Sequence, residues 1–345
     1  MDAKITKKRL SRMLSYDWIK ILLTIAAAVL VWMLIFTMTA TRITPAQQFT
    51  VFNYLGNVSF NDTKFLDLYN EIYSDGTFSY EVLEINNNDI PSTAEYASTI
   101  MEARLATNEG DVIFVSSQPN TSSEKIKNEE TGEEYYQYSY AESLLVGYFH
   151  QMYQLDPEKQ GSYFYNMEAY LNNYYKGDWT KSENLEEAKV SADFYARAKN
   201  DKRFKTDEQK KAGEAKDIQR IKDYRDALEQ FYGYLNAGVI EFVDVKMENV
   251  NSQEVTIEGT YYINICPSSD AQNRMEKLSE YVCYTTDVVE KDPQTGEDKV
   301  TENVRKADDM LVGFFHLNEM TEGFQYENVL FINALIEKTL ALGNA

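Results

Sequence analysis

ILLTIAAAVLVWMLIFTMTAT, residues 21–41, decides how the rest of this chain is organised. The run contains no charged residue and lies between Lys20 and Arg42. At about 1.5 Å per residue, a helix of this length spans roughly 32 Å, which matches the hydrocarbon core of a bilayer. We therefore expect residues 18–42 to form a transmembrane helix in contact with membrane lipid.

Two other interpretations of the apolar run are a cleaved signal peptide and a buried core helix. A signal peptide has an apolar region of about 7–15 residues, followed by a small-x-small cleavage site. This run is longer, and Met38 places a large side chain at the outer position of the Met38-Thr39-Ala40 tripeptide. A core helix rarely lacks polar residues other than Thr over about five turns. A retained signal anchor is the interpretation that we favour.

Basic residues dominate the segment before the apolar run. They are Lys4, Lys7, Lys8, Arg9, Arg12 and Lys20, against Asp2 and Asp17. An excess of Lys and Arg keeps its side of a span in the cytoplasm. We expect a cytoplasmic tail at residues 1–17, a short stalk at 43–48, and the bulk of the chain on the extracytoplasmic side of the cell membrane.

The chain beyond the apolar run is strongly acidic. The 345 residues include 34 Lys+Arg and 55 Asp+Glu, and residues 1–42 hold seven of the basic and two of the acidic ones. The remaining 303 residues therefore carry 27 basic and 53 acidic side chains. Such a surface repels nucleic acid, so we expect no nucleic-acid partner.

Cysteine and histidine are scarce in this sequence. Cys266 and Cys283 both lie outside the membrane on the expected topology, where a disulfide and two free thiols are both open alternatives. His150 and His316 are far apart in the sequence and have aromatic neighbours, which favours core or interface positions. We expect no metal site and no cofactor.

Residues 49–134 alternate between strand and helix patterns. Apolar runs typical of strands lie at 49–55, 78–85 and 111–115. Apolar residues at helical spacing lie between these runs. The order strand, helix, strand, helix, strand predicts a parallel α/β layer, the first part of an α/β lobe.

Residues 135–238 are predicted to form a helical lobe. Fourteen of the 45 residues from 135 to 179 are aromatic, against 13% for the whole chain. Tyr148, Phe149 and Tyr153 have the helical spacing that is typical of a core. The alternative is an exposed aromatic surface that contacts a sugar or a partner protein.

Residues 239–345 return to strand patterns and are expected to complete the α/β lobe. Strands are predicted at 239–245, 254–265 and 310–316. D-P-Q-T-G at residues 292–296 predicts a hairpin turn, and apolar spacing predicts a last helix at 324–342.

Several of these segments carry a resemblance to a known family. They are FTVFNYLG (49–56), YEVLEINNND (80–89), EARLATNEGDVIFVSS (102–117), GTYYINICPSS (259–269) and the stretch from DMLVGFFH to IEKTL (309–340). Together they resemble bacterial extracellular solute-binding proteins of the type II periplasmic-binding-protein-like group. The resemblance implies a two-lobed α/β ectodomain that captures a polar solute, such as a sugar, for an adjacent membrane transporter, without catalysis.

The chain departs from this family in two respects. Family members are usually lipoproteins or freely secreted, whereas this chain is expected to keep a membrane helix. Its second lobe is also predicted to be largely helical. These departures leave open a structural or scaffolding subunit of a membrane or envelope complex that keeps the fold without binding a small molecule.

The expected ligand-binding residues follow from the α/β layer, because such layers bind ligands beyond the carboxyl ends of their strands. They are Asn53, Tyr54 and Asn57 after the first strand, and Ser116, Ser117 and Gln118 after the third, with Asn88 and Asp89 after the second. Their side chains can hydrogen-bond a polar solute, and Tyr54 can stack on a sugar. The alternative is that they are ordinary loop residues.

The sequence does not point to an enzyme. No G-x-S-x-G, H-E-x-x-H, phosphate-loop or dinucleotide-binding glycine motif occurs in it. The adjacent carboxylates Glu186/Glu187 and Asp308/Asp309 are expected on the solvated surface, because neighbouring residues of a helix point in different directions. We therefore expect no catalytic residues.

Overall fold

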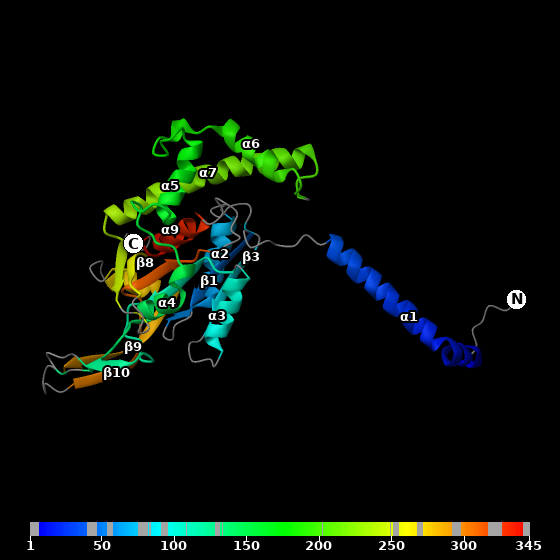
Figure 1. Ribbon diagram of the computed structural model, residues 1–345, viewed down its shortest axis with the longest axis horizontal. Coiled ribbons are helices and arrows are strands. Elements are labelled where there is room, and N and C mark those ends of the chain that lie inside the picture. Colours follow the sequence, from blue (N-terminus) through cyan, green and yellow to red (C-terminus); the bar gives the residue numbers. More distant parts are fainter. Residues whose placement is uncertain are drawn as a thin grey trace. The chain divides into compact units, whose positions relative to one another are not determined.

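The computed structural model describes most of the chain (Figure 1). The described residues are 7–39, 47–53, 58–74, 82, 84–90, 96–107, 109–127, 132, 134–201, 203–248, 250, 255–267, 272–291, 298–316 and 326–340. The chain divides into two units, Met1–Ile43 and Thr44–Ala345.

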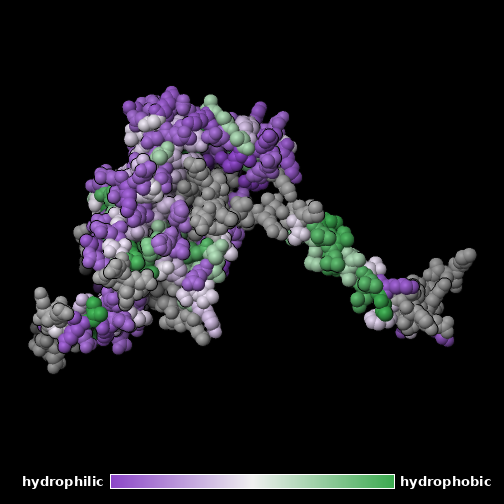
Figure 2. Space-filling view, viewed as in Figure 1, coloured by the Kyte–Doolittle hydropathy of each residue, from purple (hydrophilic) through white to green (hydrophobic). Residues whose placement is uncertain are grey.

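The first unit contains one long helix, α1 (Lys7–Thr39). Its segment Trp18–Thr37 is long and apolar enough to cross a membrane, the one such helix in the described part of the chain, and Figure 2 shows its apolar surface in green. The hydroxyls of Thr24 and Thr37 donate to backbone carbonyls one turn earlier, at 2.8 and 2.6 Å. These polar side chains are thus satisfied inside the helix, as a lipid environment requires.

The second unit is built on a six-stranded sheet of order β3-β1-β4-β11-β8-β7. The strands are β1 (Gln48–Asn53), β3 (Glu84–Asp89), β4 (Val112–Ser116), β7 (Glu241–Met247), β8 (Ile257–Asn264) and β11 (Met310–Phe314). Strand β1 is parallel to β3 and β4. The pairs β4–β11, β11–β8 and β8–β7 are antiparallel, so the sheet is mixed.

Helices α2 (Asp62–Ser74) and α3 (Ala97–Ala106) connect the three parallel strands. The predicted order of strands and helices in this part is therefore confirmed, except that a short strand that was not predicted, β2 (Val58–Phe60), lies between β1 and α2. The second strand differs from its prediction, because β3 begins at Glu84 and consists of EINNND. Asparagine is depleted in strands, which is why the sequence pattern favoured an earlier segment. Most of that segment, residues 78–81 and 83, lies outside the described residues.

Each face of the sheet carries its own hydrophobic core. Along β4, Val112 and Phe114 face one core, while Ile113 and Val115 face the other, as strand alternation requires. The first core includes side chains of α2, α5, α7 and α9, and the second includes α3 and α4. The added helices are α4 (Tyr140–Tyr148), α5 (Tyr163–Tyr174), α7 (Asp207–Asn236) and α9 (Glu327–Leu340).

The region predicted as a helical lobe consists mainly of α5, α6 (Glu187–Ala198) and α7. Phe164 of α5 stacks on Phe231 of α7 at 4.6 Å and lies 6.5 Å from Phe314 of the sheet. These helices therefore share a core with the sheet, and Thr44–Ala345 forms one compact unit. The mixed α/β class is confirmed, whereas a division into two lobes stays a prediction.

A three-stranded antiparallel sheet of order β10-β9-β2 adjoins the main one, and its longer strands are β9 (Val282–Lys291) and β10 (Asp298–Lys306). Its strands β9 and β10 confirm the predicted hairpin, although the residues of its turn lie outside the described part. The described residues include Cys266 and Cys283, which are buried and form no disulfide. The remaining described elements are β5 (Lys125–Lys127), β6 (Glu134–Tyr136), η2 (Phe149–Gln151), η3 (Ser182–Asn184) and α8 (Gln272–Leu278).

Candidate functional site

Four of the predicted ligand-binding residues lie at one edge of the main sheet, here called the carboxyl edge. Asn53 ends β1, Ser116 ends β4, and Ser117 and Gln118 follow β4 directly. Because β1 and β4 are parallel, their carboxyl ends meet at this edge. Two of the other predicted residues, Tyr54 and Asn57, lie outside the described part of the chain.

Asn53 and Ser116 point to the same face of the sheet. The residues before them, Phe52 and Val115, face one core. Because side chains alternate along a strand, Asn53 and Ser116 face the other core, which contains Val51. Both are buried, with exposed fractions of 2% and 0%. The Nδ2 of Asn53 has no hydrogen-bond partner within the described residues. The edge therefore brings two predicted residues together, but beneath the surface.

The remaining predicted residues do not converge with this pair. Ser117 is exposed. Asn88 pairs with Phe52 in the register of β3 and β1, so its side chain belongs to the opposite face from Asn53. Asp89 pairs with Asn53 along the backbone, and its side chain lies outside the described part.

Gln118 belongs to a hydrogen-bonded chain that the sequence did not predict. Its Nε2 donates to Tyr284 Oη at 3.4 Å, and Tyr284 donates to Asp308 Oδ1 at 3.0 Å. Burial, and then the negative charge of Asp308, raise the pKa of Tyr284 well above its ordinary value, so the phenol stays a donor. The prediction of a solvated Asp308/Asp309 pair was wrong, because both are half-buried and Asp309 accepts from Asn264 at 2.9 Å.

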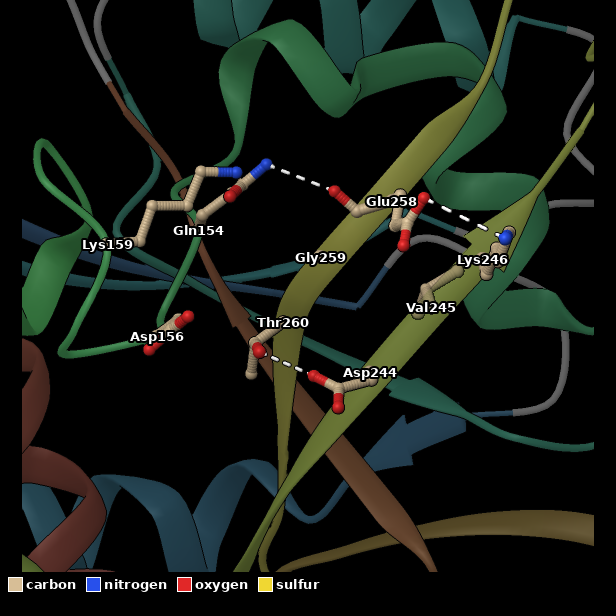
Figure 3. A pocket seen from close by; sticks show the side chains of 9 residues that line it. All are labelled: Gln154, Asp156, Lys159, Asp244, Val245, Lys246, Glu258, Gly259 and Thr260. Atoms are coloured by element: carbon tan, nitrogen blue, oxygen red, sulfur yellow. Dashed lines mark hydrogen bonds and ion pairs between the residues drawn. The ribbon is translucent and has the colours of Figure 1, made fainter.

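A cavity of about 650 Å³ lies beside β7, β8 and the loop that follows η2 (Figure 3). Its volume is within the range of roughly 300–1,000 Å³ that is usual for small-molecule sites. It is lined by Gln154, Asp156, Lys159, Asp244, Val245, Lys246, Glu258, Gly259 and Thr260. None of these residues was predicted as a ligand-binding residue.

Two backbone irregularities shape this cavity. The register of β7 against β8 shifts just before Asp244, as in a β-bulge. Gly259 has a φ of +146°, and a Cβ at this position would lie 3.0 Å from the side chain of Gln154. The glycine thus allows the loop to approach β8, where Leu155 N donates to Thr260 O at 2.7 Å. A lone glycine in a strand is a sequence signal for a bulge or a close backbone approach, but it does not identify the segment that approaches.

The charged side chains of the cavity are held in different ways. Lys246 lies 4.0 Å from Glu258. Asp244 Oδ1 accepts from the hydroxyl of Thr260 at 2.5 Å. Asp156 Oδ1 accepts from the backbone N–H two residues further along, at 2.9 Å. Among the described residues, the donors that hold the two aspartates are thus neutral groups, a hydroxyl and a backbone N–H.

The aromatic residues of positions 135–179 mostly belong to the core. Of the three residues with core spacing, Tyr148 and Tyr153 are buried and Phe149 is half-buried. Tyr163, Tyr170 and Tyr174 are buried as well. Tyr135 and Tyr165 are among the exposed large hydrophobic side chains. Most of the rings are thus unavailable for stacking on a sugar.

Neither a metal centre among the described residues nor a similar known protein identifies the site further. Among the described residues, no group of three or more His, Cys, Asp or Glu side chains is arranged to hold a metal ion. No family model, no curated protein and no solved structure matches this chain.

Proposed function

We propose that this protein is anchored in the cell membrane by α1 and captures a polar solute on the extracytoplasmic side, without catalysing a reaction. The apolar stretch of α1 supports the anchor. The excess of Lys and Arg before it supports a cytoplasmic N-terminus. The resemblance to solute-binding proteins supports a place beside a transporter that would receive the solute.

The cavity beside β7 and β8 carries this proposal. It has the size of a small-molecule site, and its walls combine charged, amide and hydroxyl groups with one valine. A polar solute can form hydrogen bonds with such groups, whereas an apolar one would leave them without partners. This observation favours a binding protein for a polar solute over a site for an apolar one.

The carboxyl edge is the second place where we propose to test for solute binding. In the order β3-β1-β4, the strands β3 and β4 lie on opposite sides of β1, which creates a topological switch point between β1 and β4. Open α/β sheets bind ligands at such points. The residues to test are Asn53, Tyr54, Asn57, Ser116, Ser117 and Gln118.

The resemblance also implies two lobes that close over the solute, and the proposed function includes this closure. The helical region 135–238 would move against the sheet. Because Phe164 packs in a core with both Phe231 and Phe314, a small movement is expected. Small-angle scattering should show a slightly smaller radius of gyration with saturating solute, and an unchanged radius would argue against closure.

A thermal-shift screen of the full chain in a neutral detergent tests solute capture. The screen would contain amino acids, amines, sugars, peptides and anions. A solute that binds only the folded protein stabilises it by about 2.7 kcal/mol at a hundredfold excess over its Kd. We expect at least one class to raise the melting temperature in proportion to the logarithm of its concentration. No shift with any class would overturn the proposal.

A structural or scaffolding subunit is the second proposed function. The observation that favours it is the burial of Asn53 and Ser116, together with the bond from Gln118 to Tyr284. These contacts are those of a rigid structural edge. A complete absence of thermal shifts, together with a stable partner that co-purifies with the full chain from the membrane, would favour this function.

A further inference from the structure

We propose that the cavity beside β7 and β8 takes an amino-acid-like solute, whose primary ammonium binds Asp156 and Asp244 and whose anionic or carbonyl group binds Lys159. This assignment rests on the proposed function, because it names the class of solute that the protein captures. It follows from the charges that line the cavity and from the way each is already paired.

Three of the five charged side chains in the cavity remain after internal pairing. Lys246 Nζ lies 3.5 Å from Glu248 and 4.0 Å from Glu258, so Lys246 is already paired with glutamates, one of which lines the cavity. What remains is Asp156, Asp244 and Lys159, with two negative charges and one positive. The solute that neutralises this set carries a cation at one end and an acceptor at the other.

Thr260 links the two carboxylates that would bind the ammonium. Its hydroxyl donates to Asp244, and its carbonyl accepts from Leu155 N, the residue next to Asp156. Figure 3 shows the two aspartates on either side of Thr260. Within the described residues, no donor is bonded to the Oδ2 of either aspartate, so each retains an oxygen for an ammonium that has three donors.

The opposite side of the cavity holds an amide with an unused acceptor. Gln154 Nε2 donates to Tyr261 Oη at 3.0 Å and to Glu258 O at 3.4 Å, which fixes the orientation of the amide. Its Oε1 is buried and accepts no hydrogen bond from the described residues. In Figure 3 the side chain of Lys159 extends toward Gln154. A bound solute would thus meet both an acceptor and an ammonium on this side.

Two other ligand classes fit the cavity less well. A metal ion would need a compact set of carboxylates, and no such group of three occurs in the described part of the chain. An anion would meet an excess of negative charge in the cavity, on a chain whose net charge is −21. Both classes remain useful as arms of the experiment.

Calorimetric titration of the full chain in phosphatidylcholine nanodiscs tests the assignment. The probes are lysine, arginine, 1,5-diaminopentane, maltose, citrate and calcium chloride. We expect the two amino acids to bind more tightly than the diamine, and the other three probes not to bind. Asp156→Asn and Asp244→Asn should each weaken lysine binding about tenfold or more, because each keeps its structural hydrogen bond and loses its charge.

Two further variants make the test specific to this cavity. Asp207→Asn removes an equal charge from a side chain that is 97% exposed on α7, and should leave binding unchanged. Lys159→Met should weaken lysine binding several-fold and leave diaminopentane binding unchanged. Equal losses for the two probes would overturn the role given to Lys159.

The other outcomes separate the solute class from the proposed function. Binding of maltose, citrate or calcium without binding of the amino acids would overturn the assignment of an amino-acid-like solute. With maltose or citrate, the proposal that the protein captures a solute would still stand. Lysine binding that survives both aspartate variants but is lost in the double variant Ser117→Ala/Gln118→Ala would move the site to the carboxyl edge. No heat with any probe, and no shift in the wider screen, would overturn solute capture itself.

Discussion

Asp111 shows at the scale of one residue how β4 is joined to β1. Its Oδ2 accepts from Thr50 N at 2.7 Å, and its own N–H donates to Thr50 O at 2.9 Å. Its carbonyl accepts from Asn328 Nδ2 at 3.2 Å. Burial raises the pKa of this carboxyl to about 7, although the bond from Thr50 opposes the shift.

The raised pKa of Asp111 predicts that stability falls as the pH rises from about 4 to about 7. In this window the unfolded chain has lost the proton, since an ordinary Asp has a pKa of about 3.9, while the folded protein still holds it. The stabilising contribution is therefore complete below pH 4 and is lost as the pH passes 7. The slope is at most about 1.4 kcal/mol per pH unit.

Asp111→Asn should remove this slope, because it removes the carboxyl group that titrates. The amide carbonyl can still accept from Thr50 N, so the hydrogen bond is kept. Chemical denaturation of the full chain in detergent at pH 5, 6 and 7.5 would measure the difference between the two proteins. We expect the variant to gain stability relative to the original chain as the pH rises. Parallel pH profiles would show that Asp111 is ionised in the folded protein throughout.

Asp217 is a second residue whose substitution we expect to change stability strongly. Its Oδ1 accepts from Arg197 at 3.0 Å and Arg220 at 2.9 Å, and the side chains of Asp217 and Arg220 are each 2% exposed. Asp217→Asn should cost about 3–5 kcal/mol of unfolding free energy, because it leaves a buried guanidinium without its carboxylate. Glu280→Gln, in an exposed pair with Lys64, is the control and should change nothing measurable. Similar effects of the two variants in denaturation curves would contradict this account.

At the scale of elements, α7 contains two glycines with opposite expectations. A Cβ at Gly213 would lie 2.6 Å from the rings of both Phe194 and Phe204, whereas a Cβ at Gly233 would meet nothing within 4 Å. Gly233→Ala should stabilise the protein by up to about 1 kcal/mol through helix propensity. Gly213→Ala should lower stability by about 1–2 kcal/mol, because overpacking outweighs the same gain.

Melting curves of the two α7 variants would test the close approach of α6 to α7. The expected result is a higher melting temperature for Gly233→Ala and a lower one for Gly213→Ala. If both variants were stabilised, the two helices would not be in contact at Gly213.

Elements with strong local patterns were predictable from the sequence. The continuous apolar runs of β1 and β4 were predicted as strands, and the last helix, predicted at 324–342, is observed at Glu327–Leu340. Strand β2 was not predicted, because it has three residues and is held by pairing with β9, more than 200 positions away. Such non-local pairing leaves no periodic signal.

At the scale of the whole molecule, the cavity could not be predicted, because its walls come from segments about 100 positions apart. Gln154 belongs to a loop, whereas Thr260 belongs to a strand. Charged residues on an edge strand also resemble ordinary solvated surface in a sequence. The carboxyl edge could be predicted, since residues that end parallel strands meet there. Its burial could not, because that depends on the packing of the neighbouring sheet.

The central claim is that the body of the protein lies outside the membrane that α1 crosses. Cysteine labelling tests it most directly, because Cys266 and Cys283 are only 2% and 0% exposed and should react slowly. In intact cells, a membrane-impermeant maleimide should label Asp207→Cys on the body, and should label Ser11→Cys before the apolar stretch only after lysis. Labelling of Ser11→Cys in intact cells, with Asp207→Cys protected until lysis, would contradict the account.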